Sequence, residues 1–307
     1  MDFTLRQLEI FLKIVEFQSI TKAARDLFLS QPAVSIQLRK LQDQFDIPLT
    51  EVVGRQLYVT KFGEDIARSA EKILAEVDAI HYKTKALRGR LAGRLKLSIV
   101  STGKYVMPYF LSDFMARHPG VDLVMDVTNK MQVVNSLENN EVDFSLVSVL
   151  PKQLKLNRVE LLHNKLFLIG GRRPEGQPKI SAKKILTTQP LLFREKGSAT
   201  RDAMERFLTI QEAPAFKKTE LTSNEALKQA IIAGLGYSIM PLIGLKNEIK
   251  NGDLEITKLK GLPIVTYWNL VWLKTKKLSP VAEAYLAFVT AEKERIIAEQ
   301  FGWVEGY

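Results

Sequence analysis

Cysteine is absent from this sequence of 307 residues, so the chain has no disulfide, no Cys-ligated zinc and no thiol nucleophile. Histidine is scarce as well, with three residues that show no metal-ligand or triad spacing: His81, His118 and His163. This shortage argues against several classes of enzyme. We therefore expect no catalytic residue, no metal site and no cofactor.

Long apolar runs are also missing. The N-terminal stretch MDFTLRQLEIF has an acidic residue at once and no basic segment followed by an unbroken apolar one, so neither a signal peptide nor a membrane span is indicated. Hydrophobic residues make up 46% and charged residues 25% of the sequence, which is ordinary for a soluble globular protein. The length allows two or three units, each with its own core. We expect a cytoplasmic protein with no membrane partner.

The sequence has no excess of negative charge, since its formal net charge is +10. A positive net charge favours polyanionic partners. The positive excess is unevenly distributed. Residues 1–60 carry seven basic and seven acidic side chains, whereas residues 95–307 carry 29 basic and 22 acidic ones. Two interpretations remain open for the second part: it binds a small anionic ligand, or its extra lysines and arginines are solvated surface charge.

The stretch from Ser19 to Asp43 reads as two short helices joined by a tight turn. Ser19 and Ser30 are suited to cap the two helix N-termini, and Pro32 fits the first turn of the second helix, where its missing N–H costs nothing. In that helix the apolar spacing predicts one buried stripe, formed by Val34, Leu38 and Leu41. The side chains expected to point away from this stripe are Pro32, Ser35, Ile36 and Arg39.

The adjacent small residues Ala23 and Ala24 allow the two helices to cross closely. A helix-turn-helix uses this geometry to present its second helix to the major groove. At the start of that helix, Gln31 offers a donor and an acceptor together, which suits N6 and N7 of adenine. The pattern favours DNA binding, and an ordinary helical hairpin is the alternative.

The residues from Leu5 to Thr60 resemble the N-terminal domain of LysR-type transcriptional regulators. Several motifs follow one another at the spacing of that family: RQLEIFLKIVE, SITKAA, SQPAVSIQLRKL and GRQLYVTKFGE. The sequence departs from the family at Ile36, which commonly is arginine, and at Thr50 and Val52, which replace a phenylalanine and an arginine. The resemblance implies a winged helix-turn-helix domain over residues 1–60. The DNA-binding residues expected on this basis are Thr21, Ser30, Gln31, Pro32, Ser35, Ile36, Arg39 and Arg55.

The weak alternation of residues 51–60 around Gly54 predicts a short β-hairpin, which would be the wing of such a domain. Arg55 at its tip is placed to enter the minor groove, where A·T tracts concentrate negative potential. A tip arginine is by default simply solvated, so the contact expected for Arg55 depends on the resemblance.

Residues 61–88 form a predicted linker helix. A heptad pattern with spacings of four and three predicts a dimerisation seam along Ile66, Ala70, Ile73, Val77, Ile80, Thr84 and Leu87. About 27 residues at 1.5 Å each give roughly 40 Å, too long to be buried within a small winged domain. We expect this helix to pair with that of a second copy. The dimer would then have two DNA-binding domains for two DNA half-sites. The alternative is a single connecting helix packed on its own domain.

A hinge is predicted at residues 89–93, in the stretch LRGRLAG. Beyond it, strand-like and helical segments alternate, which implies α/β layers around a mostly parallel sheet. Among these segments we expect a strand from Lys165 to Ile169 and a long helix from Pro280 to about Phe301. The resemblance implies a two-lobed, periplasmic-binding-protein-like (type 2) effector-binding domain over residues 94–307, with two chain crossings near Leu162 and Tyr267. The expected division assigns residues 94–162 and 268–307 to lobe I and residues 163–267 to lobe II. The chain is thus expected to be α/β with an N-terminal all-α winged helix-turn-helix domain and a long linker helix.

Three stretches follow predicted strands and open helices, where free backbone N–H groups attract anions. Their hydroxyl groups, glycine, helix dipoles and guanidinium suit a carboxylate or a phosphate. The expected effector-binding residues are Ser101, Thr102, Gly197, Ser198, Thr200, Arg201, Ser223 and Asn224. Each stretch by itself is also an ordinary helix cap. Arg201 has two acidic neighbours with which it can pair instead, Asp202 and Glu205.

The C-terminal half narrows the resemblance to one branch of the LysR family. Three segments are similar to the CbbR and RbcR branch: REKGSATRDAMERF, TSNEALKQAIIAGLGYSIMP and GLPIVTYWNLVWLKTKKLSP. Members of this branch respond to small metabolites of carbon, nitrogen or sulfur assimilation. Ala199 replaces a glycine of the branch, and its Cβ is expected to narrow one side of the pocket.

The sequence therefore predicts a LysR-type regulator whose action on promoter or operator DNA is controlled by a small anionic effector. The resemblance implies a homotetramer, a dimer of linker-helix dimers, with RNA polymerase as a further partner. Two alternatives belong to other classes: an architectural DNA-binding protein without an effector, and an enzyme with a DNA-binding appendage. Ligand-induced thermal stabilisation would separate the first alternative from a ligand-responsive regulator.

Overall fold

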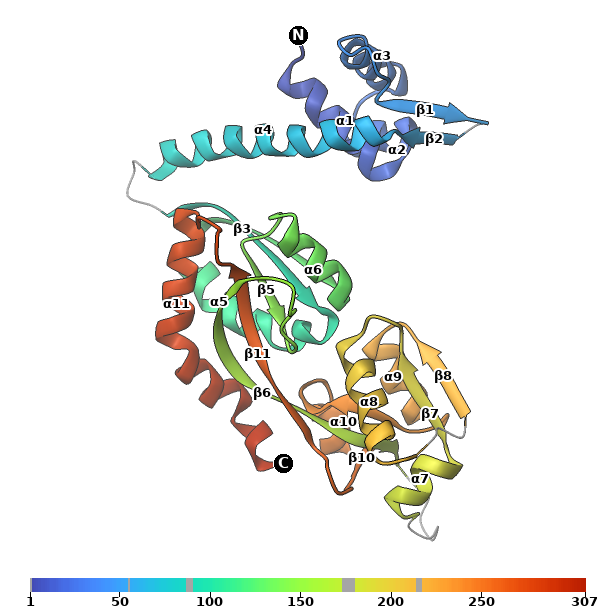
Figure 1. Ribbon diagram of the computed structural model, residues 1–307. Helices are drawn as coiled ribbons and strands as arrows, with labels where there is room; N and C mark the ends of the chain where they lie inside the picture. The colour runs from blue at the N-terminus through green and yellow to red at the C-terminus, as the bar shows by residue number, and fades with distance from the viewer. Residues whose placement is uncertain (1, 55, 87–90, 173–179, 214–216) are drawn as a thin grey trace. The chain divides into compact units, whose positions relative to one another are not determined.

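The computed structural model describes residues 2–54, 56–86, 91–172, 180–213 and 217–307. Internal contacts divide the chain into two compact units, Met1–Arg90 and Leu91–Tyr307. Figure 1 shows helices and one hairpin in the first unit, and helices packed around β-strands in the second. In the described part of the chain, no helix combines the length and the apolar character that crossing a bilayer requires.

The first unit is a helix-turn-helix domain followed by a long helix. Its elements are α1 (Leu5–Phe17), α2 (Ile20–Asp26), α3 (Gln31–Gln42), β1 (Thr50–Val53), β2 (Gln56–Val59) and α4 (Lys61–Ala86). The hydroxyl of Ser19 accepts a hydrogen bond from the backbone N–H of Lys22, and the hydroxyl of Ser30 accepts one from Ala33. Both serines therefore cap helices α2 and α3, as the sequence predicts.

The core of this unit lies between α1, α2, α3 and the first part of α4. Its buried members include the predicted stripe Val34, Leu38 and Leu41 and the small pair Ala23 and Ala24. Thr50, one of the departures from the family pattern, uses its backbone N–H and its hydroxyl to donate to Gln42 Oε1, at 3.2 and 3.0 Å. Two hydrogen bonds thus join β1 to α3 at the position where the family commonly has phenylalanine.

The second unit alternates strands and helices. Its first half contains β3 (Ala92–Val100), η1 (Ser101–Tyr105), α5 (Met107–Arg117), β4 (Gly120–Thr128), α6 (Lys130–Glu138), β5 (Phe144–Val147) and β6 (Leu156–Gly171). The chain continues with α7 (Ala182–Thr188), β7 (Pro190–Arg194), α8 (Ala199–Ile210), β8 (Lys217–Leu221), α9 (Asn224–Ile232), β9 (Ser238–Pro241), η2 (Leu242–Gly244), α10 (Lys246–Asn251) and β10 (Leu254–Thr257). It ends with β11 (Ile264–Leu273), α11 (Pro280–Ile296), η3 (Ile297–Phe301) and η4 (Gly302–Gly306).

Two long antiparallel strands, β6 and β11, connect the halves of this unit. The strand order is β10-β6-β11-β5-β3-β4, with β9 also paired to β6, and β7 pairs with β8 in parallel. We call the half with β3, β4, β5, α5, α6 and α11 lobe I, and the half with β7 to β10 and α7 to α10 lobe II (Figure 1). The pairing of β6 with β11 shifts register between Tyr267 and Asn269. Two α/β lobes joined by two strands form a periplasmic-binding-protein-like fold, so the expected fold class is confirmed.

Some element boundaries differ from the expected ones. Ala92 and Gly93, assigned to the hinge, pair with β4 as the first residues of β3. Strand β6 begins at Leu156, well before the strand expected from Lys165. The predicted helix from Pro280 to Phe301 is α-helical to Ile296, widens into a π-helical turn over Ile297–Phe301 and is followed by a tighter 3-10 turn over Gly302–Gly306. These differences leave the order of the expected elements unchanged.

Candidate functional site

The exposed face of α3 is the first candidate. Gln31, Pro32, Ile36 and Arg39 are exposed and Ser35 is partly exposed, whereas the apolar stripe of the same helix is buried. Thr21 on α2 and the cap residue Ser30 are exposed as well. The described residues predicted to contact DNA therefore all reach solvent. Arg55, predicted at the tip of the wing, lies outside the described residues.

The hairpin that follows α3 carries exposed apolar side chains. Val52 and Val53 on β1 are 68% and 61% exposed, and β1 pairs with β2 in antiparallel register from Thr50 to Val53. Val52 occupies the position where the family that the sequence resembles commonly has arginine, so this strand presents an exposed aliphatic side chain there instead of a cation.

The long helix α4 divides the predicted seam into two parts. Ile66 and Ala70 pack into the core of their own domain, with Ala70 only 1% exposed. Further along the helix, Ile73 and Ile80 are 39% and 62% exposed and Val77 is partly exposed. The side chain of Thr84 and the whole of Leu87 lie outside the described residues. The N-terminal end of the predicted seam therefore serves its own domain, and the exposed apolar positions begin at Ile73.

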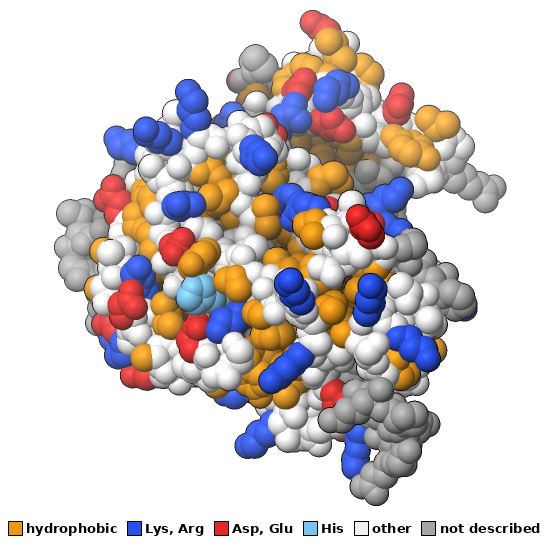
Figure 2. All heavy atoms as spheres, turned by 60° about the horizontal axis from the view of Figure 1, so that its bottom comes forward, with side chains coloured by type: hydrophobic (Ala, Val, Ile, Leu, Met, Phe, Trp, Pro, Cys, Tyr) orange, Lys and Arg blue, Asp and Glu red, His pale blue; other side chains and the backbone are white. Residues whose placement is uncertain are grey.

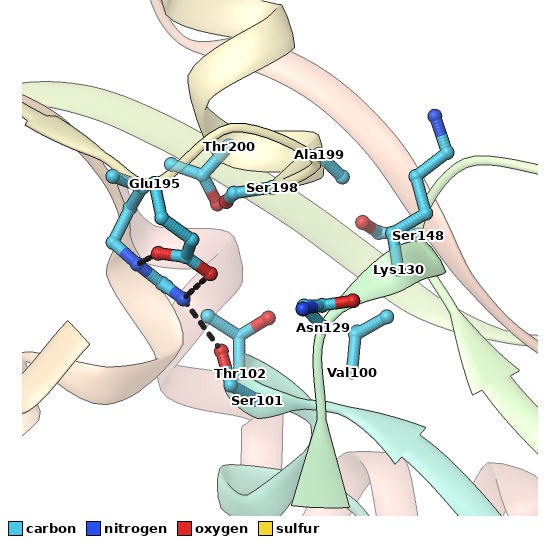
Figure 3. Close-up of a pocket in the computed structure, with 11 residues that line it drawn as sticks. Val100, Ser101, Thr102, Asn129, Lys130, Ser148, Glu195, Ser198, Ala199 and Thr200 are labelled. Carbon is cyan, nitrogen blue, oxygen red and sulfur yellow. Dashed lines mark hydrogen bonds and ion pairs between the residues drawn. The ribbon is translucent and has the colours of Figure 1, made fainter. Parts of the chain in front are cut away.

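In the second unit, a pocket lies where the two lobes face each other. Lobe I contributes residues that follow the strands β3, β4 and β5, and lobe II contributes the end of β7 and the start of α8. The pocket is narrow and partly open to solvent. The lining residues are Val100, Ser101, Thr102, Asn129, Lys130, Ser148, Arg194, Glu195, Ser198, Ala199 and Thr200. All of them except Arg194 are labelled in Figure 3. Four of the predicted effector residues, Ser101, Thr102, Ser198 and Thr200, meet here.

The N-terminus of α8 forms one wall of the pocket. Ser198 is the N-cap residue, but its side chain accepts no hydrogen bond from the backbone of the first turn. Its neighbours Ala199 and Thr200 also line the pocket (Figure 3). The first N–H groups of a helix have no partner within the helix, and their partial positive charge favours an anion. Since no side chain caps them here, a bound oxyanion can take that role.

The sequence interpretation missed five polar residues of this pocket, which are Asn129, Lys130, Ser148, Arg194 and Glu195. Arg194 is the most buried charged residue among them. It is only 4% exposed, at the end of β7. Its guanidinium donates to both oxygens of Glu195, each at 2.8 Å, and to the hydroxyl of Ser101 at 3.2 Å. The last bond joins lobe II to lobe I. The available signal was its place at the carboxyl end of a parallel strand, where α/β folds bind ligands.

Arg201, the arginine expected in the pocket, is not among the lining residues. Its Nε donates to Glu205 at 2.9 Å, and its Nη1 donates to Glu220 and to the backbone carbonyl of Arg194. The guanidinium therefore ties α8 to β8 and to the end of β7. The structure has the alternative arrangement, in which Arg201 pairs with Glu205.

The remaining predicted effector residues lie around the pocket. Asn224 is buried and donates from Nδ2 to the hydroxyl of Ser101 at 3.1 Å, while its Oδ1 has no hydrogen-bond partner among the described residues. Ser223 caps α9 through the N–H of Ala226. Gly197 has a φ of +87° and lines an adjoining open groove with Lys130 and Asp202. Ser101 thus receives two bonds from lobe II, one from Arg194 and one from Asn224.

The mouth of the pocket carries a further contact between the lobes. Lys130 at the start of α6 lies 3.3 Å from Asp202 in the first turn of α8, and both side chains are partly exposed. On the face shown in Figure 2, lysine and arginine side chains are dispersed among hydrophobic and uncharged surface. The charged side chains that line the pocket are Lys130, Arg194 and Glu195. Within the described ranges, no group of three or more His, Asp or Glu side chains is arranged to hold a metal.

Both units match known families. Residues 5–64 match the bacterial regulatory helix-turn-helix proteins of the lysR family, and residues 88–294 match the LysR substrate binding domain. The chain is 35% identical to the HTH-type transcriptional activator CmpR of Synechocystis sp. over 301 residues, 97% of this chain and 98% of the relative. It is 36% identical to the HTH-type transcriptional regulator CbbR of Rhodospirillum rubrum over 287 residues, 94% of this chain and 96% of the relative.

Solved structures agree with these matches. The regulatory domain of CcmR from Synechocystis PCC6803, in complex with 2-PG, is 32% identical with a TM-score of 0.61, over 66% of this chain and 98% of that domain. The LysR family regulator CbnR is 19% identical with a TM-score of 0.71, over 95% of this chain and 99% of CbnR. At this identity the second likeness concerns the fold alone.

Proposed function

The chain belongs to the LysR family of bacterial transcriptional regulators, and we propose that a small anionic metabolite, bound between Ser101 and Ser198, controls its action on promoter DNA. It is a DNA-binding regulator with an effector-binding domain, and not an enzyme. The observation that carries the proposal is the convergence in one pocket of an uncapped helix N-terminus, hydroxyl groups from both lobes and a buried guanidinium.

The lining favours a ligand with two oxyanion groups. The N-terminus of α8, with Ser198 and Thr200, would hold one group by backbone and hydroxyl donors. Arg194, Ser101 and Thr102 would hold the other, because a guanidinium binds carboxylate and phosphate in a fork. The ligand of the CcmR relative, 2-phosphoglycolate, carries one group of each kind. We therefore propose a small phosphorylated carboxylic acid as the effector class, with Arg194 in the role first expected for Arg201.

The proposed DNA-reading surface is the exposed face of α3 with its flanking residues. Gln31 would read a base edge from the N-terminal end of the helix, and Arg39 would contact phosphate. The other residues proposed for this surface are Thr21, Ser30, Pro32, Ser35, Ile36 and Arg55.

We also propose that two copies of the chain pair through α4. The exposed apolar positions Ile73, Val77 and Ile80 would form the contact, and two such dimers would make the tetramer. Promoter DNA and RNA polymerase are proposed as the macromolecular partners. Because its DNA target is chromosomal, the proposed location is the cytoplasm.

The domain limits proposed for this regulator are residues 1–60 for DNA binding, 61–88 for the linker helix, 89–93 for the hinge and 94–307 for effector binding. The limits proposed for the lobes are residues 94–162 with 268–307, and residues 163–267. The division of the contacts after Arg90 supports the first set, and the register shift after Tyr267 supports the second.

Isothermal titration of the full-length chain tests the effector proposal. We expect saturable heat with 2-phosphoglycolate and none with glycolate, which lacks the phosphate. The double substitution Arg194→Met with Glu195→Met removes the pocket ion pair without leaving an unpaired buried charge. It should abolish binding while the unfolding temperature stays near that of the native chain.

An absence of binding by 2-phosphoglycolate and by a panel of other phosphorylated acids would contradict the proposal. It would favour the architectural alternative, a DNA-binding protein without an effector.

A further inference from the structure

Glu195 occupies the position on Arg194 that an anionic ligand would take. Nε of Arg194 lies 2.8 Å from Oε2 of Glu195, and Nη2 lies 2.8 Å from Oε1, so the carboxylate is bound bidentately (Figure 3). Both residues line the pocket. A carboxylate or phosphate ligand would use the same two N–H groups in the same geometry. The internal carboxylate and an external one therefore compete for one site.

Because the guanidinium of Arg194 is buried, a ligand can bind it only by replacing the carboxylate of Glu195. The side chain of Arg194 is 3% exposed, and a buried guanidinium without an anionic partner is strongly unfavourable. Arg194 therefore needs an anion at all times, either from Glu195 or from the ligand. The side chain of Glu195 is 17% exposed, so it has access to solvent at the edge of the pocket. When it leaves, it can be hydrated, and Arg194 remains paired with the ligand.

The backbone around Glu195 allows the side chain to move alone. The carbonyl of Glu195 accepts the N–H of Ser198 at 3.2 Å in the turn that leads into α8, and Gly197 in this turn has a φ of +87°. This turn fixes the main chain of the pocket wall whether or not the carboxylate is bound to Arg194. Rotation about the side-chain bonds of Glu195 is sufficient for the exchange.

We propose that Glu195 is a built-in competitor for the effector, held on Arg194 in the empty pocket and displaced from it by the anionic group of the ligand. This inference rests on the proposed function, since it concerns the same pocket. It adds a selectivity rule: a ligand needs a forked oxyanion to replace Glu195, so neutral sugars and monodentate anions are excluded. Because Arg194 also donates to Ser101 of lobe I, the exchange takes place at a contact between the lobes.

The substitution Glu195→Gln tests the competitor. Glutamine has the same size and lacks the charge, so it should release Arg194 easily. We expect its affinity for 2-phosphoglycolate in isothermal titration to exceed that of the native chain by about tenfold or more, the equivalent of one charge-assisted hydrogen bond. Glu205→Gln is the matched control, because it removes a carboxylate from Arg201 in the same lobe, outside the pocket. Its affinity should equal that of the native chain.

Structural evidence separates displacement from simple repulsion between Glu195 and the ligand. In a crystal structure of the native chain with 2-phosphoglycolate, we expect the ligand on Nε and Nη2 of Arg194 and the Glu195 carboxylate turned to solvent. A bound ligand with the Arg194–Glu195 pair intact would overturn the proposal. If Glu195→Gln does not fold, Glu195→Asp replaces it, since the shorter carboxylate reaches the guanidinium less well and should also raise the affinity.

The titrations also separate the two proposals. Equal affinity of native chain and Glu195→Gln would overturn the competitor and leave the effector pocket standing. Failure of both proteins to bind 2-phosphoglycolate or inorganic phosphate would overturn the effector pocket itself, and the competitor with it.

Discussion

Two arginines of lobe II, seven positions apart, differ in their surroundings. Arg194 lies in the pocket and bonds to Ser101 of lobe I, whereas Arg201 bonds to Glu205, to Glu220 and to the main chain of Arg194. The helix-opening position of Arg201 made it the expected ligand residue. Its acidic partner Glu220 on β8 is distant in sequence. The sequence alone therefore could not show that Arg201 forms ion pairs in the fold.

Arg201→Ala should therefore affect stability more than ligand binding. It removes the shared partner of two half-exposed carboxylates and a bond to a strand end, so we expect a loss of about 1–2 kcal/mol in the free energy of unfolding. The affinity for 2-phosphoglycolate should change by less than about threefold, under 0.7 kcal/mol. Chemical denaturation and calorimetry measure the two effects, with the exposed Arg206→Ala on the same helix as control. Loss of ligand affinity in a protein of native stability would return Arg201 to the effector site.

Gln31→Ala tests the reading of a base. The side chain is exposed at the N-terminal end of α3, and a bidentate contact to adenine discriminates by about 1–3 kcal/mol. We expect this loss on the selected operator and no loss on random DNA, measured by fluorescence anisotropy at one salt concentration. Arg39→Ala should weaken binding to both DNAs. Gln37→Ala, the same change outside the proposed surface, is the control, and unchanged operator affinity of Gln31→Ala would refute the base contact.

At the scale of elements, local signals predicted most of the helices and strands. Ser19 and Ser30 cap helices where expected, because a cap is decided by neighbouring residues. Strand β6 was expected at Lys165 but starts at Leu156, and its first residues pair with the distant end of β11. Polar residues in that stretch, such as Asn157 and Arg158, give no alternating pattern. Pairing across more than 100 positions is not visible in such a segment.

The heptad pattern of the linker helix α4 also predicted its packing only in part. The heptad pattern marked Ile66 and Ala70 as seam positions, but the same spacing also fits packing against α1, and both residues lie in the domain core. A heptad pattern identifies an apolar face without identifying what covers it. The part of the face that is exposed in this chain, with Ile73 and Ile80, is the part that we propose contacts a second copy.

Val77→Asp tests that contact. A carboxylate buried between two linker helices without a partner costs several kcal/mol, so we expect the dimer to dissociate. Light scattering should show a smaller species. Ala75→Asp introduces the same charge on the exposed opposite side of the heptad and should keep the native mass. An unchanged mass for Val77→Asp would refute pairing through this face.

The C-terminal segment after α11 is an element that the sequence did not assign to any role. Lys165 on β6 donates to the Val304 carbonyl at 3.2 Å and to Glu305 Oε2 at 2.8 Å, and His163 Nδ1 lies 2.9 Å from Glu305 Oε1. Hydrogen bonds from Lys165 and then His163 lower the pKa of Glu305 below its usual value. The interactions of ionised Glu305 with Lys165 and His163 therefore stabilise the fold at neutral pH. This contribution is lost as the pH falls and Glu305 is protonated.

Glu305→Gln should accordingly lower the free energy of unfolding at pH 7, by less than about 1 kcal/mol because Glu305 is half-exposed. The difference from the native chain should shrink as the pH falls and vanish at an acidic pH below the lowered pKa of Glu305, where the carboxyl group is neutral in both states. Denaturation at both pH values measures it, with the exposed Glu294→Gln as control. A difference that persists at low pH would show that the ion pair is not its cause.

For the whole molecule, the sequence predicted the two units and their fold types, because both contain long motifs in a fixed order. The net charge of +10 predicted less. On the face shown in Figure 2 the basic side chains are dispersed among hydrophobic and uncharged surface. The anion binding proposed for the pocket rests instead on Arg194 and the start of α8, which composition cannot reveal.

Regulation of DNA binding by the pocket is the central claim, and one measurement tests it directly. An operator is selected from random DNA with the full-length chain, and its affinity and footprint are then measured at fixed salt with and without saturating 2-phosphoglycolate. A ligand that binds open and closed lobes unequally must shift their equilibrium. The account predicts a changed footprint or affinity for the native chain, and no change for the pocket variant Arg194→Met with Glu195→Met. An identical footprint and affinity of the native chain, at a concentration where calorimetry shows the pocket filled, would contradict it.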